Sequence, residues 1–358
     1  MPINNNYTPF MKFKVNEVAG LSALSSQVKA QIKPFFDIPR KDGMKKSDFE
    51  KALKDCRKKA DKYLKQFHHI FIDSFDIPDN IAKKGSPNCA SIIKEFENFN
   101  YIPVLGLDRS LDHNDTIFKA KDNNEIISNT VAVRLQSEEF LSYELIEYEL
   151  QDLINEGFDL FDHWIFIFDC RFCANIDTVS TAEKIADFIK SLKPIIKIQE
   201  FIITGSSIPA AITDIAKPSK ESIVDRTELA VFHHIQRILG ENTVSLGDYT
   251  IVSPNYSEIN IEPELLLSVT APKVFYTYQG HHYIARGSRI KTHGYGQYDE
   301  IFESISVKKF FRGSPYSWGD NFIQERANGI RVKNVTPSTV LKPTICAHIT
   351  YMANSYPA

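Results

Sequence analysis

The sequence has no long apolar run, no excess of positive charge and few cysteines. None of its stretches reaches the roughly 18 consecutive apolar residues that a membrane span requires, and Met1–Asn6 lacks the apolar core of a signal peptide. The formal net charge of −3 argues against an extended nucleic-acid-binding surface. Five cysteines are an odd number at scattered positions, so no disulfide framework is expected. We therefore expect a cytoplasmic protein that does not contact membranes.

Short β-rich runs alternate along the 358 residues with stretches of helical spacing. Several runs are continuously apolar, as expected for parallel strands that are buried on both faces. Strands are predicted near Tyr7–Phe13, Ile32–Ile38, His69–Ser74, Tyr101–Leu107, Val131–Gln136, Trp164–Asp169, Phe201–Thr204 and Val244–Val252. Helices are predicted at Val15–Val28, Ser47–Phe67, Ala90–Glu97, Glu138–Glu156, Thr181–Leu192 and Arg226–Leu239.

This alternation predicts an α/β fold built on a parallel sheet. Such a sheet is either open and doubly wound or closed into a (β/α)8 barrel of the TIM type. Eight units within about 250 residues favour the barrel, which we assign to residues 1–254. The connection 108–130 shows no convincing helix and is read as a loop, and the connection 209–224 is predicted to be mostly loop.

The pattern changes after Pro254. Val274–Tyr278 and His282–Arg286 flank the short connection around Gly280, which predicts an antiparallel hairpin. A helical run from Gln297 to Phe310, a loop at Gly313–Asn321 and a last apolar stretch follow. We assign residues 255–358 to a C-terminal hairpin and helical elaboration packed on the barrel.

Polar residues that follow the predicted strands identify the candidate site, because barrel sites form at the carboxyl ends of the strands. They are Lys12, Lys14, Asp37, Arg40, Asp73, Asp76, Asp108, Arg109, Arg134, Gln136, Asp169, Arg171, Gly205, Ser206, Ser207, Asp248 and Tyr249. Arg134 and Asp169 stand out because each lies in or ends an apolar strand, where a buried charge is costly unless it is paired. Either they form a structural ion pair, or they share a ligand-binding or catalytic role.

The turn Gly205-Ser206-Ser207 offers backbone N–H groups and two hydroxyls to an anion, and it follows the seventh strand, where many barrels hold phosphate. It is equally compatible with a simple strand-ending turn. Arg226 and Glu228 open the next helix, as a capping pair or facing the barrel opening. The acidic strand ends could together hold a cation such as Mg²⁺, although no compact metal motif is present. We predict Asp169, Asp248 and Glu228 as catalytic residues, and Arg134, Gly205–Ser207, Arg226 and Tyr249 as ligand-binding residues.

The order and spacing of these segments resemble the beta protein family, which is named for a tailed-phage protein. The resemblance is carried by Tyr7-Thr8-Pro9-Phe10, Glu17, Lys33-Pro34-Phe35-Phe36-Asp37-Ile38, Val133-Arg134-Leu135, Phe168-Asp169, Gly205–Pro209, Arg226-Thr227-Glu228, Gly247-Asp248-Tyr249, Tyr276-Thr277, Arg286-Gly287, Phe311-Arg312-Gly313, Tyr316–Asp320 and Ala347-His348-Ile349. It implies a barrel-like protein in a phage- or defence-associated context, without an established reaction.

Three functions are compatible with these residues. The first is an enzyme acting on a phosphorylated or otherwise anionic small molecule, such as a nucleotide, by hydrolysis or phosphoryl chemistry. The second is a non-catalytic module that senses a nucleotide or binds a protein partner in a phage–host conflict system. The third is a barrel whose strand-end charges only satisfy one another.

Overall fold

The structure is a computed structural model that describes residues 7–78, 81, 86–256, 268–330 and 333–355. The polar N-terminus, Met1–Asn6, lies outside the described residues. The chain divides into two compact units. The first comprises residues 1–14, 32–205 and 227–248, and the second comprises residues 15–31, 206–226 and 249–358. The second unit thus includes residues 15–31, 206–226 and 249–254, three segments from the range 1–254 that the sequence assigned to the barrel.

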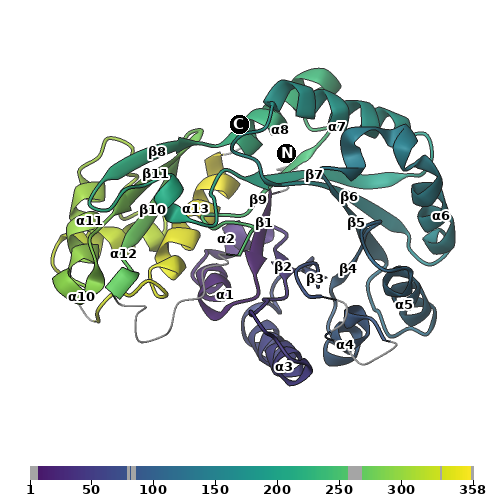
Figure 1. The fold of residues 1–358 in the computed structure, drawn as a ribbon, viewed down its shortest axis with the longest axis horizontal. Coiled ribbons are helices and arrows are strands. Elements are labelled where there is room, and N and C mark those ends of the chain that lie inside the picture. Colours follow the sequence, from purple (N-terminus) through teal and green to yellow (C-terminus); the bar gives the residue numbers. More distant parts are fainter. Residues whose placement is uncertain (1–6, 79–80, 82–85, 257–267, 331–332, 356–358) are drawn as a thin grey trace. The chain divides into compact units, whose positions relative to one another are not determined.

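The first unit contains a closed barrel of eight parallel strands (Figure 1). The strands, in their order around the barrel, are β1 (Tyr7–Lys12), β2 (Phe35–Asp37), β3 (Phe71–Asp73), β4 (Ile102–Leu105), β5 (Thr130–Gln136), β6 (His163–Phe172), β7 (Ile198–Ser206) and β9 (Ser245–Asp248). β9 closes the barrel by pairing with β7 on one side and β1 on the other. All eight strands coincide with the predicted ones, and the (β/α)8 fold is confirmed.

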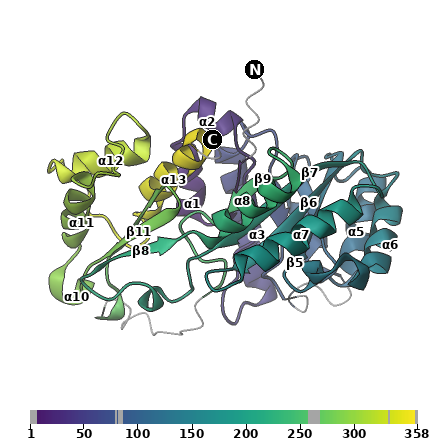
Figure 2. The same ribbon diagram turned by 90° about the horizontal axis from the view of Figure 1, so that it is seen from above.

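Helices cover the outside of the barrel. They are α3 (Lys46–Tyr63), α4 (Asn88–Glu95), α5 (Leu111–Asp122), α6 (Glu147–Gly157), α7 (Thr178–Leu192) and α8 (Thr227–Leu239). Figure 2 shows α7 and α8 side by side on the outer face. The helix predicted at Glu138–Glu156 is shorter: two 3-10 turns, Glu139–Leu141 and Tyr143–Leu145, precede α6.

The prediction that residues 108–130 form a loop was wrong, because this connection contains α5. The helix has few apolar positions, and contacts to the end of β4 hold it in place. Buried His113 forms a hydrogen bond through Nε2 with the Val104 carbonyl, at 3.0 Å. Asn114 accepts from the Gly106 N–H at 3.3 Å and donates to the Gly106 carbonyl at 2.9 Å. These bonds depend on tertiary structure, which periodicity does not detect.

The second unit contains a three-stranded antiparallel sheet in the order β10 (Lys273–Tyr278), β11 (His281–Arg286) and β8 (Glu221–Asp225). The predicted hairpin is therefore confirmed. Residues 209–224 were predicted to be mostly loop, and residues 209–220 contain only one 3-10 turn, Ile212–Asp214. The prediction missed β8, which begins at Glu221 and supplies the third strand. β8 alternates exposed and half-buried residues, and its partner strand lies far along the chain, so no local signal marked it.

Helices flank this sheet within the second unit. They are α1 (Val15–Ser22), α2 (Ser26–Ala30), α10 (Ile290–His293), α11 (Gln297–Ser306), α12 (Trp318–Ala327) and α13 (Leu341–Ser355). α11 and α12 share a core with one face of the sheet, which includes Tyr276, Tyr298 and Phe302. α1 packs closely on α13, where a Cβ on Gly20 would lie 2.8 Å from Cγ2 of Ile345. None of the described helices is long and apolar enough to cross a bilayer.

Replacing Asn114 by Ala should destabilise the barrel by about 1–3 kcal/mol, because the buried amide groups of Gly106 lose their partner. Urea denaturation measures this in a Trp318→Phe background, where Trp164 of the barrel is the remaining tryptophan. Exposed Asp122 on the same helix is the control, and Asp122→Ala should change stability by less than about 0.5 kcal/mol. Equal effects of the two changes would contradict the anchoring role of Asn114.

Candidate functional site at the barrel mouth

The barrel interior is layered, because alternate residues of each strand point inward. One layer is aromatic: the rings of Phe10 and Phe35 stack with centres 4.3 Å apart, and Phe35 and Phe71 follow at 5.5 Å. Two residues further along β2 and β3, Asp37 and Asp73 form part of the next layer. This charged layer and the residues that follow the strands are called the barrel mouth below.

Arg134 on β5 lies at the centre of the barrel mouth and is fully buried. Its Nε and Nη2 both donate to Oδ2 of Asp169, at 2.9 and 2.6 Å. Its Nη1 donates to Oδ1 of Asp37 at 2.7 Å and to Oδ2 of Asp73 at 2.8 Å. The Arg134–Asp169 pairing is thus present, within a larger cluster that joins β2, β3, β5 and β6.

A second set of charges surrounds this cluster. Lys12 on β1 donates to Asp37 at 3.1 Å and also contacts Asp76. Arg171, after Asp169 on β6, donates to Asp76 at 3.3 Å. Burial alone would raise the pKa of Asp37, but the guanidinium of Arg134, assisted by Lys12 and Arg171, outweighs burial and holds this pKa well below its usual value of 3.8. Asp37 is therefore an anion at neutral pH.

Phe75 covers Arg134 at the outer end of the barrel mouth. The guanidinium carbon of Arg134 lies 4.5 Å from the centre of the Phe75 ring, and those of Arg171 and Arg109 lie 4.6 and 4.8 Å away. Such contacts stabilise a cation against an aromatic face. Sequence patterns did not identify Phe75, because an aromatic residue in a loop carries no positional signal of its own.

Arg109, which follows β4, connects the barrel mouth to the carboxyl groups of Asp108 and Glu139. It donates to Asp73 at 2.8 Å and to Asp108 at 3.2 Å. Burial raises the pKa of Asp108, and burial raises the pKa of Glu139 to about 7, with the Asp108 carboxylate contributing to the latter. Glu139 accepts a hydrogen bond from the backbone N–H of Gln136 at 2.6 Å. Carboxyl groups with raised pKa are typical of general acid–base sites. Glu139 was missed because it does not directly follow a strand.

The other residues predicted for the first unit are Asp248, Glu228 and Gly205, and each has its own surroundings. Asp248 is buried and accepts from the Tyr7 hydroxyl at 2.6 Å. Glu228 is buried in the first turn of α8. A Cβ on Gly205 would lie 2.9 Å from the sulfur of Cys173 and 3.4 Å from Cβ of Glu228, so strand and helix approach closely here. Their catalytic and ligand-binding roles stay predictions.

Four predicted ligand-binding residues belong to the second unit. Ser206 closes its own turn, since its hydroxyl accepts from the Ile208 N–H at 3.1 Å and donates to the Val252 carbonyl at 3.2 Å. Arg226 is buried and contacts the sulfur of Met352 at 3.0 Å. Ser207 and Tyr249 are also buried. The hydroxyl of Ser206 is thus engaged within the turn, as in a strand-ending turn.

A cation such as Mg²⁺ does not fit the acidic cluster of the barrel mouth. Asp37, Asp73 and Asp169 converge, yet the guanidinium of Arg134 occupies the position between them. Across the described part of the chain, no group of three or more His, Cys, Asp or Glu side chains is arranged to hold a metal. We therefore assign no metal to the barrel mouth.

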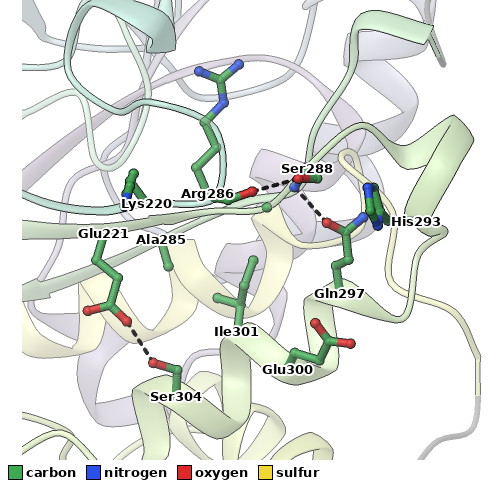
Figure 3. Close-up of a pocket in the computed structure, with 12 residues that line it drawn as sticks. Lys220, Glu221, Ala285, Arg286, Ser288, His293, Gln297, Glu300, Ile301 and Ser304 are labelled. Atoms are coloured by element: carbon green, nitrogen blue, oxygen red, sulfur yellow. Dashed lines mark hydrogen bonds between the residues drawn. The ribbon is translucent and has the colours of Figure 1, made fainter.

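The second unit has an open pocket of about 410 Å³ between β8, β11 and α11 (Figure 3). Its polar groups mostly contact one another. Gln297 accepts from the Ser288 N–H at 2.7 Å and donates to the Gly294 carbonyl at 2.9 Å. Glu221 accepts from Ser304 at 2.9 Å. Arg286 points away from Gln297 and Glu300, as Figure 3 shows. Among the described residues, fewer buried polar atoms lack a hydrogen-bond partner in this pocket than in the barrel mouth.

The fold and the charged mouth define a parallel (β/α)8 barrel protein that carries a second α+β unit. Within that class, the family model described as Beta protein matches residues 7–354, and the chain belongs to this family. The resemblance of its sequence segments to this family is thereby confirmed. Comparison with curated proteins and with solved structures found no match.

Replacing Arg134 by Leu should destabilise the barrel by about 3–5 kcal/mol, because three buried carboxylates lose their shared counter-charge. Urea denaturation followed by Trp164 fluorescence measures this. The control is Lys190→Ala, which removes an exposed ion pair with Asp187 and should cost less than about 1 kcal/mol. A small effect of Arg134→Leu would exclude a central role for the cluster in folding.

Glu139 should make the barrel less stable as the pH rises from 4.5 to about 7. In this window the folded state keeps the proton on Glu139 while the unfolded chain, with an ordinary pKa of 4.5, has lost it, so raising the pH favours unfolding. Glu139→Gln cannot ionise and should remove this part of the decline. Urea midpoints across the window test it, with exposed Glu138→Gln as control; identical pH profiles for wild type and Glu139→Gln would refute it.

Proposed function

We propose that the barrel mouth binds a phosphorylated small molecule, such as a sugar phosphate or nucleotide, and that its carboxyl groups act on it by acid–base chemistry. The observation that carries the proposal is a pair of unsatisfied buried atoms, Oδ1 of Asp73 and Nε2 of Gln136, which have no hydrogen-bond partner among the described residues. Buried polar atoms are normally paired. An acceptor at the end of β3 and a donor at the end of β5, with β4 between these two strands, suit the hydroxyl groups of a sugar.

The cations of the barrel mouth supply the complementary site for phosphate. Lys12 and Arg171 flank the neutralised cluster, and the Arg171 side chain is 19% exposed. Arg171 has a left-handed backbone with φ of +49°, held by a hydrogen bond of 2.8 Å from its N–H to Asp169. A non-glycine residue rarely adopts this conformation, and such strain is concentrated at functional sites. In this proposal Arg134 positions the carboxylates, and Arg171 contacts the ligand.

A purely structural role explains the barrel mouth less well. Replacing a buried ion cluster by apolar side chains of similar volume is often neutral or stabilising, so a cluster of this many charged groups is not needed to hold a barrel together. Proteins depart from such packing rules at functional sites. The phage- or defence-associated setting is also part of the proposal, and it is supported by the family resemblance. A non-catalytic nucleotide sensor is the alternative outcome of the experiment below.

The test is a thermal-shift and calorimetric titration of the full chain with nucleotides and sugar phosphates. A ligand at 100 times its Kd should stabilise the folded state by about 2.7 kcal/mol. Arg171→Gln and Gln136→Leu should each remove this shift. Gln136→Leu is the sharper variant, because removing an unpaired buried donor should leave the ligand-free protein as stable as before.

Exposed Arg237 on α8 provides the matched control, and Arg237→Gln should bind as the wild type does. Asp169→Asn is a poor test of catalysis, since it removes the bidentate partner of Arg134 and disturbs folding. Binding without product identifies the sensor, and absence of any shift overturns the proposal.

A further inference from the structure

The barrel unit has a cavity of about 510 Å³ between α5 and α6, beside the barrel mouth, with which it shares Arg109. Its apolar surface comes from Leu107, Ile146 and Leu153. Leu107 follows β4, Ile146 precedes α6, and Leu153 is a buried residue of α6. The cavity is therefore formed by secondary-structure elements of one unit, and it is large enough for one or two side chains of a ligand.

The rim of this cavity is acidic. Glu149, Asp152 and Glu156 on α6 line it and are exposed, as is Asp115 on α5, which pairs with Lys119 at 2.6 Å. The acidity extends well beyond the rim, because residues 138–162 contain nine Asp or Glu and no Lys or Arg. A run of one sign without compensating charge produces a local negative potential that attracts cations and repels phosphate. The cavity is thus unsuited to the ligand proposed for the barrel mouth.

Large apolar side chains are exposed beside the acidic rim. Tyr148, which lines the cavity, is 75% exposed, and Leu145 in the turn before α6 is 70% exposed. Leu141 in the preceding turn is 48% exposed. Grouped apolar exposure of this kind marks protein interaction sites rather than ordinary solvated surface. Acidic and apolar side chains together fit a partner that is both basic and apolar.

Arg109 places a further condition on the chemistry of the ligand. It lines the cavity, its side chain is 9% exposed, and its Nη atoms donate to Asp73 and Asp108. Its Nε is a buried donor that has no hydrogen-bond partner in the described part of the chain. A ligand group that reaches this buried Nε must therefore be a hydrogen-bond acceptor. A polyamine has no acceptor, whereas a peptide backbone carries a carbonyl at every residue.

We propose that the cavity between α5 and α6 is a docking site for a basic, apolar peptide segment of a partner protein. A leucine or aromatic side chain of the segment fills the space beside Leu153. Flanking Lys or Arg side chains contact Asp152 and Glu156, and a backbone carbonyl accepts from Nε of Arg109. This site adjoins the proposed phosphate site at Arg109, but the acidic and apolar contacts of the peptide do not depend on a ligand in the barrel mouth.

The experiment uses the full chain and a fluorescent peptide in which Lys alternates with Leu around one Trp. Fluorescence anisotropy should show saturable binding that weakens with salt, as expected for a charge-assisted apolar contact. Asp152→Lys combined with Glu156→Lys should weaken binding by roughly tenfold or more, and Tyr148→Ser should weaken it to a similar degree. Asp187→Lys, an exposed charge reversal on α7, should leave binding unchanged.

Three results would overturn the proposal. A peptide of Lys and Gly that binds as tightly as the apolar one would reveal a non-specific acidic surface. If the apolar peptide does not bind, the cavity is not a docking site for a basic, apolar segment. Self-association of the chain that Asp152→Lys abolishes, seen by sedimentation velocity, would make a second copy the occupant. The phosphate-dependent thermal shift of the barrel mouth should be the same in Asp152→Lys as in the wild type, so the two proposals fail separately.

Discussion

The guanidinium of Arg134 is the interaction on which the barrel interior depends. It donates hydrogen bonds to three carboxylates from β2, β3 and β6, strands that are far apart in sequence. Its central carbon lies 5.0 Å from the centre of the Phe35 ring and 4.5 Å from that of the Phe75 ring. A charge buried in this way requires all its partners at once. The position of each strand end is therefore constrained by the positions of the other strand ends. The residues that follow these strand ends are held in place by the same contacts.

Within the barrel mouth, some residues hold the geometry of the site and others are placed to contact a ligand. Asp37 and Asp169 are fully buried and engaged by Arg134, so they hold the geometry, whereas Arg171 and Gln136 lie further toward the carboxyl ends of their strands. Positioning groups behind contacting groups is what a precise site requires. It also explains why polar residues at strand ends are ambiguous in the sequence, since both kinds follow the same apolar strands.

The sequence was sufficient for the barrel because its strands are apolar on both faces, and that property is local. Arg134 and Asp169 could be identified for the same reason, because a charged residue within an apolar strand must be buried and must therefore be paired. It could not predict α5, which depends on His113 and Asn114 reaching the end of β4. Nor could it predict β8, whose pairing with β11 is non-local, or Phe75, whose role depends on where Arg134 lies. What was missed depends in each case on contacts between distant segments.

Arg109 connects the two sites proposed for the barrel unit. Its Nη2 bonds to Asp73 inside the barrel mouth, while the residue also lines the cavity between α5 and α6 and carries a buried Nε. A carbonyl that accepts from Nε would fix the plane of the guanidinium, and with it the hydrogen bond to Asp73. Any resulting effect of a docked peptide on ligand affinity must be matched by an equal effect of the ligand on peptide affinity, because binding free energies at two sites are reciprocally linked. If the Arg109 side chain is rigid, peptide binding changes the ligand affinity little; if the side chain reorients when the peptide binds, the change is large. The size of this change in affinity therefore reports how firmly the Asp73–Arg109 ion pair is held.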